Sequence, residues 1–467
     1  MMKKLILLLF ALLPVVACAE TVEINNVYYN LTVSTKTAEV TSNDAVSNYY
    51  HGSVSIPPTV KHNGVTYNVT AIGNGAFNSC KRLTSVSLPN GITAIGGAAF
   101  LDCVALTTVN IPSSVKTIGS GAFLSCAALT SVTITDVAAW CVTELGSEAS
   151  NPFRILRQFR VNDKEVKDLV IPNGVTSIGK YAFNSCSNLT SVAIPASVTT
   201  VGTYAFENCT ALTSVKITDL KSWCGISFYD KESNPLFYAH KLYLNGAKVK
   251  DLVIPAGVTI IGNNAFPGGD FSSVTFHDDV ERIENYCFYQ CTNLTAITIP
   301  NKVTVLNAST FRECTSLKSV TIGNGVIGLG SQCFMDCSNL TTVVFGTAIH
   351  TLYRQTFANC PKLKNVYCYM ENLPSLSSSE MYEGTPIQQA TLHVPSALLS
   401  QYQNATPWKS FGTILPLKDS DPKPAAITSV IMDGKTDSSK VYRIDGQRVG
   451  QPHKGLYIVN GRKVVIK

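Results

Sequence analysis

Cysteine is the residue type whose number and spacing in this chain first suggest chemistry. Nine of the fifteen cysteines stand three residues after a phenylalanine, in a column broken only by Gly269; they are Cys80, Cys103, Cys126, Cys186, Cys209, Cys291, Cys314, Cys337 and Cys360. In an exported protein such a set would suggest disulfides. Equivalent positions on stacked coils, however, point the same way about 4.8 Å apart, whereas a disulfide needs Cβ atoms about 3.8 Å apart. We therefore expect a ladder of buried free thiols.

The other reactive residue types do not form a catalytic or metal-binding pattern. There is no Cys-x-x-Cys pair, and the seven histidines show no metal-ligand spacing. No Gly-x-Ser-x-Gly nucleophile elbow is present. Gly323-Asn-Gly-Val-Ile-Gly328 matches the letters of a dinucleotide-binding motif, but its Asn324-Gly325-Val326 repeats Asn173-Gly174-Val175, and no βαβ pattern follows. We expect a protein that is not an enzyme and that holds no cofactor and no metal.

An internal repeat dominates the chain. Phenylalanines recur mostly at intervals of 23, with one interval of 22 and two of 60; they are Phe77, Phe100, Phe123, Phe183, Phe206, Phe266, Phe288, Phe311, Phe334 and Phe357. A repeat of this length is typical of a solenoid, in which one coil cannot bury its apolar face unless neighbours stack on it.

Each repeat contains a short alternating stretch that predicts one strand. In Leu189-Thr-Ser-Val192-Ala-Ile194 the apolar residues point inward, and Pro195 ends the strand because it cannot donate a backbone hydrogen bond. The pair Ala182-Phe183 is expected to fill the interior of the coil. The pattern predicts strands that end near fourteen apolar anchors: Ile56, Leu88, Ile111, Ile134, Ile171, Ile194, Ile217, Ile254, Phe276, Ile299, Ile322, Phe345, Cys368 and Val394.

Two of the predicted coils are longer than the rest, 37 residues instead of 23. They span residues 135–171 and 218–254 and match each other at an offset of 83, with Trp140-Cys141 against Trp223-Cys224. The second ends in a run with Asn245-Gly246, which predicts a hairpin turn. This resemblance indicates duplication of a block of three coils.

The ends of the chain differ from the repeats. Residues 1–19 have the positive start and short apolar run of a secretory signal, too short to span a bilayer. Both cleavage after Ala19 and lipidation of Cys18 fit this segment. The remaining predicted regions are an N-terminal β cap at 20–70, the solenoid at 71–368, a C-terminal cap at 369–417, a Pro-containing linker at 418–439 and a tail at 440–467.

The formal net charge of +6 comes from the ends of the chain. The first 19 residues carry two lysines, and residues 440–467 carry seven basic residues against one aspartate, so residues 20–439 have a net charge of −2. A nearly neutral body offers no electrostatic footprint for nucleic acid. Contact with a membrane is expected only if Cys18 is lipidated.

The repeat Ile178-Gly-Lys-Tyr-Ala-Phe183-Asn-Ser-Cys186-Ser-Asn-Leu189-Thr-Ser-Val192-Ala-Ile194-Pro195 resembles that of the BspA-like leucine-rich-repeat cell-surface proteins of Bacteroidetes. The resemblance covers roughly residues 54–417. It implies a right-handed, β-rich leucine-rich-repeat solenoid with roles in adhesion, and it brings no catalytic residues. The tail, with Asp445-Gly446 and Asn460-Gly461, is similar to short C-terminal sorting domains of the same phylum. A small terminal β hairpin is the alternative interpretation of this tail.

These observations favour an exported protein, at the cell surface or extracellular, that binds an extracellular protein or glycan. The regular strands present mild Ser and Thr side chains, whereas binding hot spots usually need Trp, Tyr or Arg. Only the two long coils supply bulky residues, and we expect them to form two halves of one patch: Trp140, Phe153, Arg154, Arg157 and Phe159 in the first, and Trp223, Phe228, Tyr229, Phe237 and Tyr238 in the second. A structural spacer of the cell envelope, without a dedicated ligand, is the alternative.

Removal of residues 440–467 is expected to abolish surface display in the native host and to leave the thermal stability of the repeats unchanged. The reason is that this basic tail follows a linker and lies outside the repeat. Cell fractionation and thermal melting measure the two effects. Unchanged display of the truncated protein would contradict the sorting role and favour Cys18 as the anchor.

Overall fold

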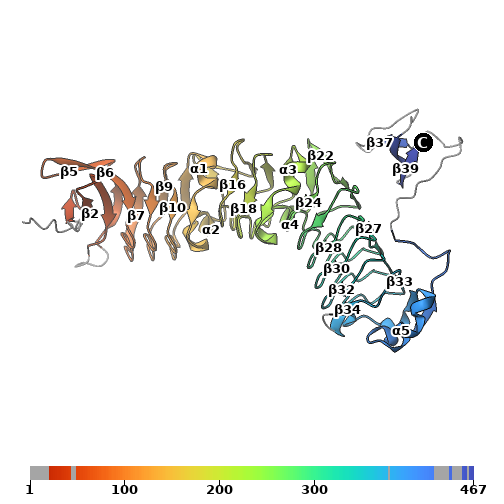
Figure 1. The fold of residues 1–467 in the computed structure, drawn as a ribbon. Coiled ribbons are helices and arrows are strands. Elements are labelled where there is room, and N and C mark those ends of the chain that lie inside the picture. The colour runs from red at the N-terminus through yellow and green to blue at the C-terminus, as the bar shows by residue number, and fades with distance from the viewer. Residues whose placement is uncertain are drawn as a thin grey trace, which may run out of the picture. The chain divides into compact units, whose positions relative to one another are not determined.

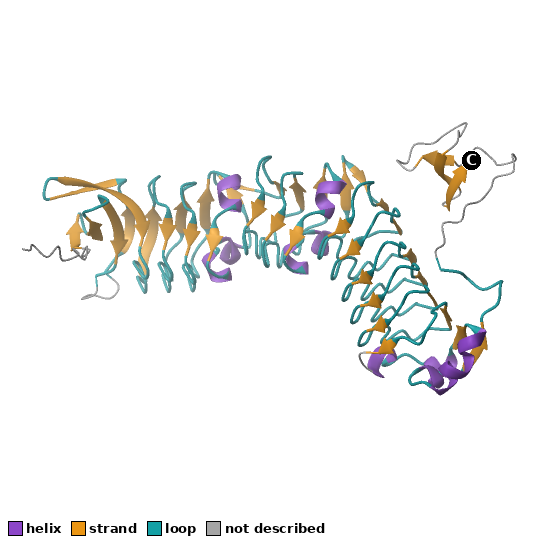
Figure 2. Ribbon diagram, in the orientation of Figure 1, coloured by secondary structure: helices purple, strands orange, loops and turns teal. Residues whose placement is uncertain are grey.

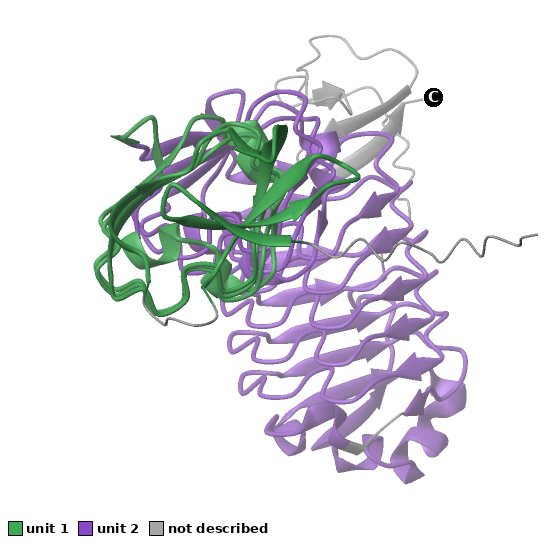
Figure 3. Ribbon diagram, turned by 90° about the vertical axis from the view of Figure 1, so that its left-hand side faces the viewer, with its two compact units in different colours: residues 1–156, 160–164 green, residues 157–159, 165–467 purple. Residues whose placement is uncertain are grey.

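A computed structural model describes residues 20–43, 49–376 and 379–424, and the backbone of strands at 441–443, 455–459 and 462–466. The predicted signal at 1–19, with Cys18, and residues 425–439 of the predicted linker lie outside the described residues. The chain divides into two compact units, residues 1–156 with 160–164 and residues 157–159 with 165–467 (Figure 3). Each unit is a stack of coils and is described by itself.

The first unit begins with a β cap. Its strands are β1 (Glu20–Ile24), β2 (Val27–Thr32), β3 (Thr37–Thr41), β5 (Thr59–His62) and β6 (Val65–Ile72). Strands β1, β2 and β3 pair antiparallel, and β3 then pairs parallel with β6. Inward residues alternate along β2, where Val27, Tyr29 and Leu31 are buried. The cap therefore carries the chain from an antiparallel sheet into the parallel stack.

Each coil of the first unit contributes one strand to each of two parallel ladders (Figure 1). The repeat ladder contains the predicted anchors and comprises β4 (His51–Ser55), β7 (Arg82–Ser87), β9 (Thr108–Ile111), β11 (Ser131–Ile134) and β13 (Arg160–Val161), with β14 (Lys164–Glu165) at its edge. The short ladder continues from β6 and comprises β8 (Ala94–Ile95), β10 (Thr117–Ile118) and β12 (Glu144–Leu145). The short ladder was not predicted from the sequence.

The second unit repeats this arrangement. Its repeat ladder comprises β15 (Asp168–Val170), β17 (Ser191–Ile194), β19 (Ser214–Ile217), β21 (Leu242–Leu244), β23 (Asp251–Val253), β25 (Ser273–Thr275), β27 (Ala296–Thr298), β29 (Ser319–Thr321), β31 (Thr342–Phe345), β33 (Asn365–Cys368), β35 (Thr391–Val394) and β36 (Thr413–Pro416). Its short ladder comprises β16 (Ser177–Ile178), β18 (Thr200–Val201), β20 (Ser227–Phe228), β24 (Ile260–Ile261), β26 (Arg282–Ile283), β28 (Val305–Leu306), β30 (Gly328–Leu329), β32 (Thr351–Leu352) and β34 (Ser375–Leu376). Partners within a ladder are mostly 23 residues apart, as for Val192 and Val215.

The predicted strand ends are confirmed. Each of the fourteen anchors is either the last residue of a strand, as Ile194 and Phe345 are, or the residue directly after one, as Ile171 and Ile254 are. The buried Ala182 and Phe183 also occupy the interior of their coil as predicted.

The two long coils differ from the prediction because each contains an additional rung. Ile134 pairs with Val161, and Ile217 pairs with Leu244, 27 residues further along in both cases. In the second long coil a hairpin to β22 (Ala247–Lys248) follows, and its turn residues Asn245 and Gly246 have the positive φ that the Asn-Gly pair predicts. Each long coil also carries helices, shown in Figure 2: α1 (Val137–Cys141), η1 (Glu148–Ser150) and α2 (Phe153–Leu156) in the first, and α3 (Leu220–Cys224), η2 (Lys231–Ser233) and α4 (Leu236–Ala239) in the second.

The C-terminal end of the second unit closes with short helices around buried aromatics. The helices are η3 (Ser379–Tyr382), η4 (Ile387–Gln389), η5 (Ser396–Leu398), α5 (Leu399–Asn404) and η6 (Trp408–Ser410). The edge of Tyr382 packs on Trp408 with ring centroids 6.2 Å apart, and Tyr402 packs on Trp408 at 5.4 Å. In the predicted tail, β37 (Val441–Arg443), β38 (Gly455–Val459) and β39 (Arg462–Ile466) form an antiparallel sheet.

The core of the stack is a column of parallel phenylalanine rings. In the first unit Phe77, Phe100 and Phe123 stack with centroids 5.1 and 5.2 Å apart. In the second unit five consecutive rings stack 5.3 to 5.5 Å apart within 11° of parallel, from Phe266 to Phe357. Each ring is buried only because the next coil covers it, so the side chain that defines the repeat also joins the coils.

The cysteine column lies beside these rings. All fourteen cysteines among the described residues are buried free thiols. Most of the column donates to the carbonyl oxygen of the phenylalanine one coil back: Cys126 Sγ lies 3.0 Å from Phe100 O, and Cys314 Sγ lies 3.3 Å from Phe288 O. The prediction of a buried thiol ladder is confirmed in its placement, and the hydrogen bond adds a reason for cysteine at this position.

The thiols are expected to be reduced and to weaken the fold at alkaline pH. Burial raises the pKa of Cys126 and Cys314 from 9.0 to about 12. Between pH 9 and 12 the unfolded chain releases protons that the folded chain keeps, so the free energy of unfolding falls as the pH rises. Thiol counting with a disulfide reagent should find these groups only after denaturation, and denaturant titrations from pH 8 to 11 should show the loss.

A double variant, Cys126→Ala with Cys314→Ala, should show a shallower dependence of the free energy of unfolding on pH. This control separates the thiols from buried tyrosines such as Tyr29, whose pKa burial also raises. Four or more disulfides within the column would contradict the thiol ladder.

Candidate functional site

The two long coils share a buried frame. Asp136 and Asp219 cap the first helix of each by accepting backbone N–H groups, at 2.8 Å from Ala138 N and 2.8 Å from Lys221 N. The indole of Trp223 donates to Ala265 O across 2.9 Å. The frame therefore explains the sequence match at an offset of 83 as a match of structural residues.

Five of the predicted ligand-binding residues belong to this frame. Trp140, Phe153, Phe159, Trp223 and Phe228 are buried. The rings of Trp140 and Phe153 meet edge to face at 5.2 Å, and those of Trp223 and Phe228 lie 5.2 Å apart. The prediction that these residues contact a ligand is corrected: their apolar area is used to pack each long coil onto the stack.

Buried amides fix the second long coil to the coil that follows it. Asn234 Nδ2 donates to Asn264 O at 2.8 Å and Ala265 O at 3.0 Å, while its Oδ1 accepts from Leu236 N at 2.9 Å. Asn264 Nδ2 donates to Phe228 O at 3.2 Å. Satisfied polar networks in a buried setting are rigid, so α4 is held in one position.

The surface of the first long coil is polar. Arg154 forms an ion pair with Glu148 at 3.2 Å, and both side chains are well exposed. Arg157 is also exposed. An exposed ion pair of this kind contributes about 0.2–1 kcal/mol to stability, so these two arginines stay available for contact with a partner.

The second long coil presents aromatic residues at the equivalent positions. Where the first has Glu148 and Arg154, the second has Lys231 and Phe237, and Lys231 Nζ lies 5.2 Å from the centre of the Phe237 ring. Tyr229, which replaces Gly146, is 70% exposed. The ion pair of one coil is thus a cation–π pair in the other.

Aromatic residues of neighbouring coils extend this surface within the second unit. The rings of Tyr181 and Tyr204 lie 6.0 Å apart, Phe237 lies 6.4 Å from Tyr289, and Tyr289 lies 5.9 Å from Tyr286. Asp230 joins the first group to the long coil, because its carboxylate accepts from Tyr204 N at 3.2 Å. We call this set the aromatic track: Tyr181, Tyr204, Tyr229, Phe237, Tyr238, Tyr286 and Tyr289.

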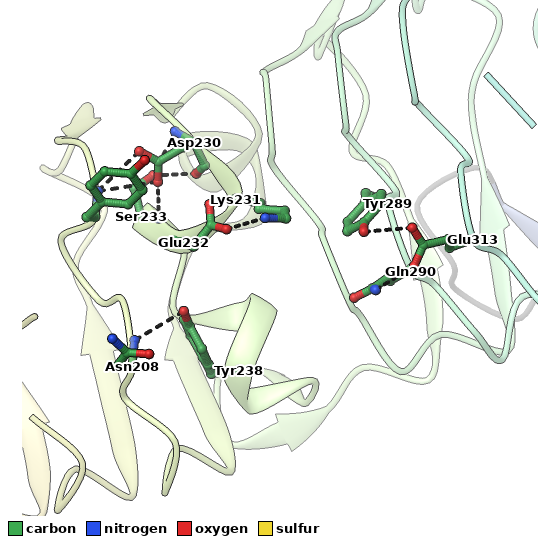
Figure 4. A network of polar contacts seen from close by, with 10 residues as sticks. Asn208, Asp230, Lys231, Glu232, Ser233, Tyr238, Tyr289, Gln290 and Glu313 are labelled. Atoms are coloured by element: carbon green, nitrogen blue, oxygen red, sulfur yellow. Dashed lines mark hydrogen bonds and ion pairs between the residues drawn. The ribbon is translucent and has the colours of Figure 1, made fainter. Parts of the chain in front are cut away.

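Polar groups line the aromatic track (Figure 4). Asp230 also accepts from Ser233 N at 2.6 Å, and burial raises the pKa of its carboxyl group against the lowering effect of these hydrogen bonds. The hydroxyl of Tyr238 accepts from Asn208 N at 3.1 Å, and burial raises its pKa to about 12. Glu313 accepts from the Tyr289 hydroxyl at 2.8 Å.

Three tyrosines of the aromatic track have an unusual backbone conformation. Tyr181, Tyr204 and Tyr286 stand two residues before the core phenylalanine and have φ of 61°, 55° and 54°. Other coils place glycine or a small or amide side chain there, as at Gly75 and Gly121. Left-handed φ is uncommon for non-glycine residues and rarer still for bulky ones.

The sequence prediction included Tyr229, Phe237 and Tyr238 but missed the four tyrosines outside the long coil. The signal that could have found them is the column itself, in which a large aromatic replaces a glycine. Among the described residues no group of three or more His, Cys, Asp or Glu could hold a metal ion. No described helix is long and apolar enough to cross a membrane.

Comparison with known proteins gives a family for this architecture. Residues 59–164, 154–235 and 239–396 match the model of the BspA type leucine rich repeat region, in six copies. No curated protein matches the sequence.

Solved structures also match the chain. A leucine-rich repeat protein from Bacteroides ovatus is 26% identical, with a TM-score of 0.52, over 85% of this chain and 100% of that one. A leucine rich cell surface protein from Faecalibacterium prausnitzii is 25% identical, with a TM-score of 0.43, over 86% and 96%. The pneumococcal vaccine antigen PcpA, 16% identical with a TM-score of 0.50 over 86% and 99%, shares the fold. The chain belongs to the BspA type leucine-rich repeat family.

Proposed function

We propose that this protein is exported, is held at the cell surface and binds an extracellular protein or glycan through the aromatic track. The observation that carries the proposal is the placement of exposed tyrosines at left-handed backbone positions. Tyr204 and Tyr286 are 38% and 37% exposed. Export rests on the signal-like residues 1–19, and attachment rests on either Cys18 or the basic tail.

The left-handed tyrosines reduce the stability of the fold. A residue held in a sparsely populated φ/ψ region costs about 1–3 kcal/mol, and Gly75 and Gly121 avoid that cost at equivalent positions. The rings of Tyr204 and Tyr286 are too exposed to recover it by burial. Strain that the fold does not need is characteristic of functional sites.

The rest of the surface favours the same location. Hot spots of binding interfaces are rich in Tyr, Trp and Arg, and the three tryptophans of the chain, Trp140, Trp223 and Trp408, are buried. Function also concentrates on irregular loops held by a rigid scaffold, and Asn234 and Asn264 provide that support for the second long coil. The exposed Arg154 and Arg157 are the residues of the first long coil that remain candidates for contact.

Replacing the surface of the second long coil by that of the first is expected to weaken ligand binding at least tenfold. The variant combines Tyr229→Gly, Lys231→Glu and Phe237→Arg, which are the residues at 146, 148 and 154. It removes the exposed aromatics and leaves the buried frame intact. An array of extracellular proteins and glycans, probed with the purified full chain, measures binding.

The matched control is Arg154→Ala in the first long coil, which should change affinity little. Unchanged affinity of the triple variant would place recognition elsewhere. A wild-type chain that binds nothing on the array would favour the structural spacer.

Tyr204→Gly is expected to weaken binding while changing the free energy of unfolding by less than about 1 kcal/mol. Glycine relieves the left-handed strain and offsets the lost ring contacts and the entropy of the unfolded chain. The control Tyr243→Gly lies in β21, where glycine should destabilise by more, because a strand disfavours it. Denaturant titration of both variants decides; equal losses would show that Tyr204 is a structural residue.

A further inference from the structure

We propose that the ligand of the aromatic track is an uncharged glycan chain that lies along successive coils. This inference rests on the proposed function and narrows it from an extracellular protein or glycan to one class. It follows from the spacing of the rings, the repetition of polar pairs and the sign of the charge along the track.

The rings of the aromatic track form a row and not a tight stack. Tyr181 and Tyr204 are 6.0 Å apart and tilted by 33°, and Phe237 and Tyr289 are 6.4 Å apart and tilted by 31°. The core rings of Phe311 and Phe334, by contrast, are 5.5 Å apart and within 2° of parallel. Splayed, exposed rings leave their negative faces open to C–H groups, and the C–H face of a sugar ring has that chemistry.

A polar pair of the same kind occurs on both sides of the second long coil in the sequence. Asn184 Nδ2 donates to Glu207 Oε2 at 2.8 Å, and Gln290 Nε2 donates to Glu313 Oε2 at 2.7 Å. In each pair an amide and a carboxylate come from coils 23 residues apart. Together they supply donors and acceptors that can meet neighbouring sugar hydroxyl groups.

The two ends of the aromatic track therefore resemble each other. One end combines Tyr181 and Tyr204 with the Asn184–Glu207 pair, and the other combines Tyr286 and Tyr289 with the Gln290–Glu313 pair. Rungs of a β ladder repeat about every 4.8 Å, so similar groups recur along the stack. A polymer of similar units fits a surface of similar units, whereas the surface of a globular protein does not repeat.

The charge of the track excludes acidic polymers. Asp230, Glu207, Glu232 and Glu313 outnumber the cations Lys231 and Arg312. Glu232 forms an ion pair with Lys231, and Glu313 lies 3.3 Å from the Arg312 guanidinium. Like charges across an interface suppress binding, so sulfated or uronic acid chains are disfavoured and a neutral chain is not.

The test is affinity electrophoresis of the full chain in gels that contain a soluble neutral polysaccharide: a mannan, a β-glucan, a xylan or a galactan. A polygalacturonate gel is the acidic comparison. We expect at least one neutral polysaccharide to retard the protein and the acidic one to have no effect. Tyr204→Ala and Tyr286→Ala should each weaken retardation about tenfold, and the double variant should abolish it, because both ends hold one chain.

The matched control is Tyr353→Ala, since Tyr353 is 44% exposed but lies outside the aromatic track. It should bind as the wild type does, and thermal melting should show all variants folded. Retardation that survives the double substitution overturns the glycan assignment. If no neutral polysaccharide binds while an extracellular protein binds through Tyr204 and Tyr286, the glycan inference is wrong and the proposed function stands. If neither class binds through these residues, both are wrong.

Discussion

The fold depends on contact between one coil and the next. A single coil of 23 residues has no interior: Phe311 is buried because Phe288 and Phe334 lie against its two faces. The backbone ladders and the thiol hydrogen bond of Cys314 follow the same spacing. Each interface between coils therefore combines a ring, a thiol and two rungs, and stability is the sum of many similar interfaces.

The period of the sequence predicted the repeat ladder well, because Val192 and Ile194 alternate with polar residues and Pro195 marks the end of the strand. The short ladder was missed because strands of two residues, such as Thr200–Val201, are too brief to show alternation. The additional rungs were missed for another reason. Leu242–Leu244 reads as part of a hairpin, and only the structure shows that it also pairs with β19.

The candidate site was predicted in part, because residue type does not reveal exposure. Trp223 and Tyr229 are both large aromatics in one long coil, yet one donates a buried hydrogen bond and the other is exposed. Tyr204 and Tyr286 could have been noticed as aromatics in a column that elsewhere holds glycine. Their joining to Phe237 could not, since it depends on how a coil of irregular length lies against regular ones.

The paired frames of the two long coils separate the residues that hold the loop from those that face outward. Asp136 and Asp219, Trp140 and Trp223, and Asn151 and Asn234 are the same on both copies, while the exposed positions have become Glu and Arg on one and Lys and Phe on the other. Selection can therefore vary the outward residues without risk to folding. A duplicated block gives such a lineage a second surface on which new specificities can evolve while the first is retained.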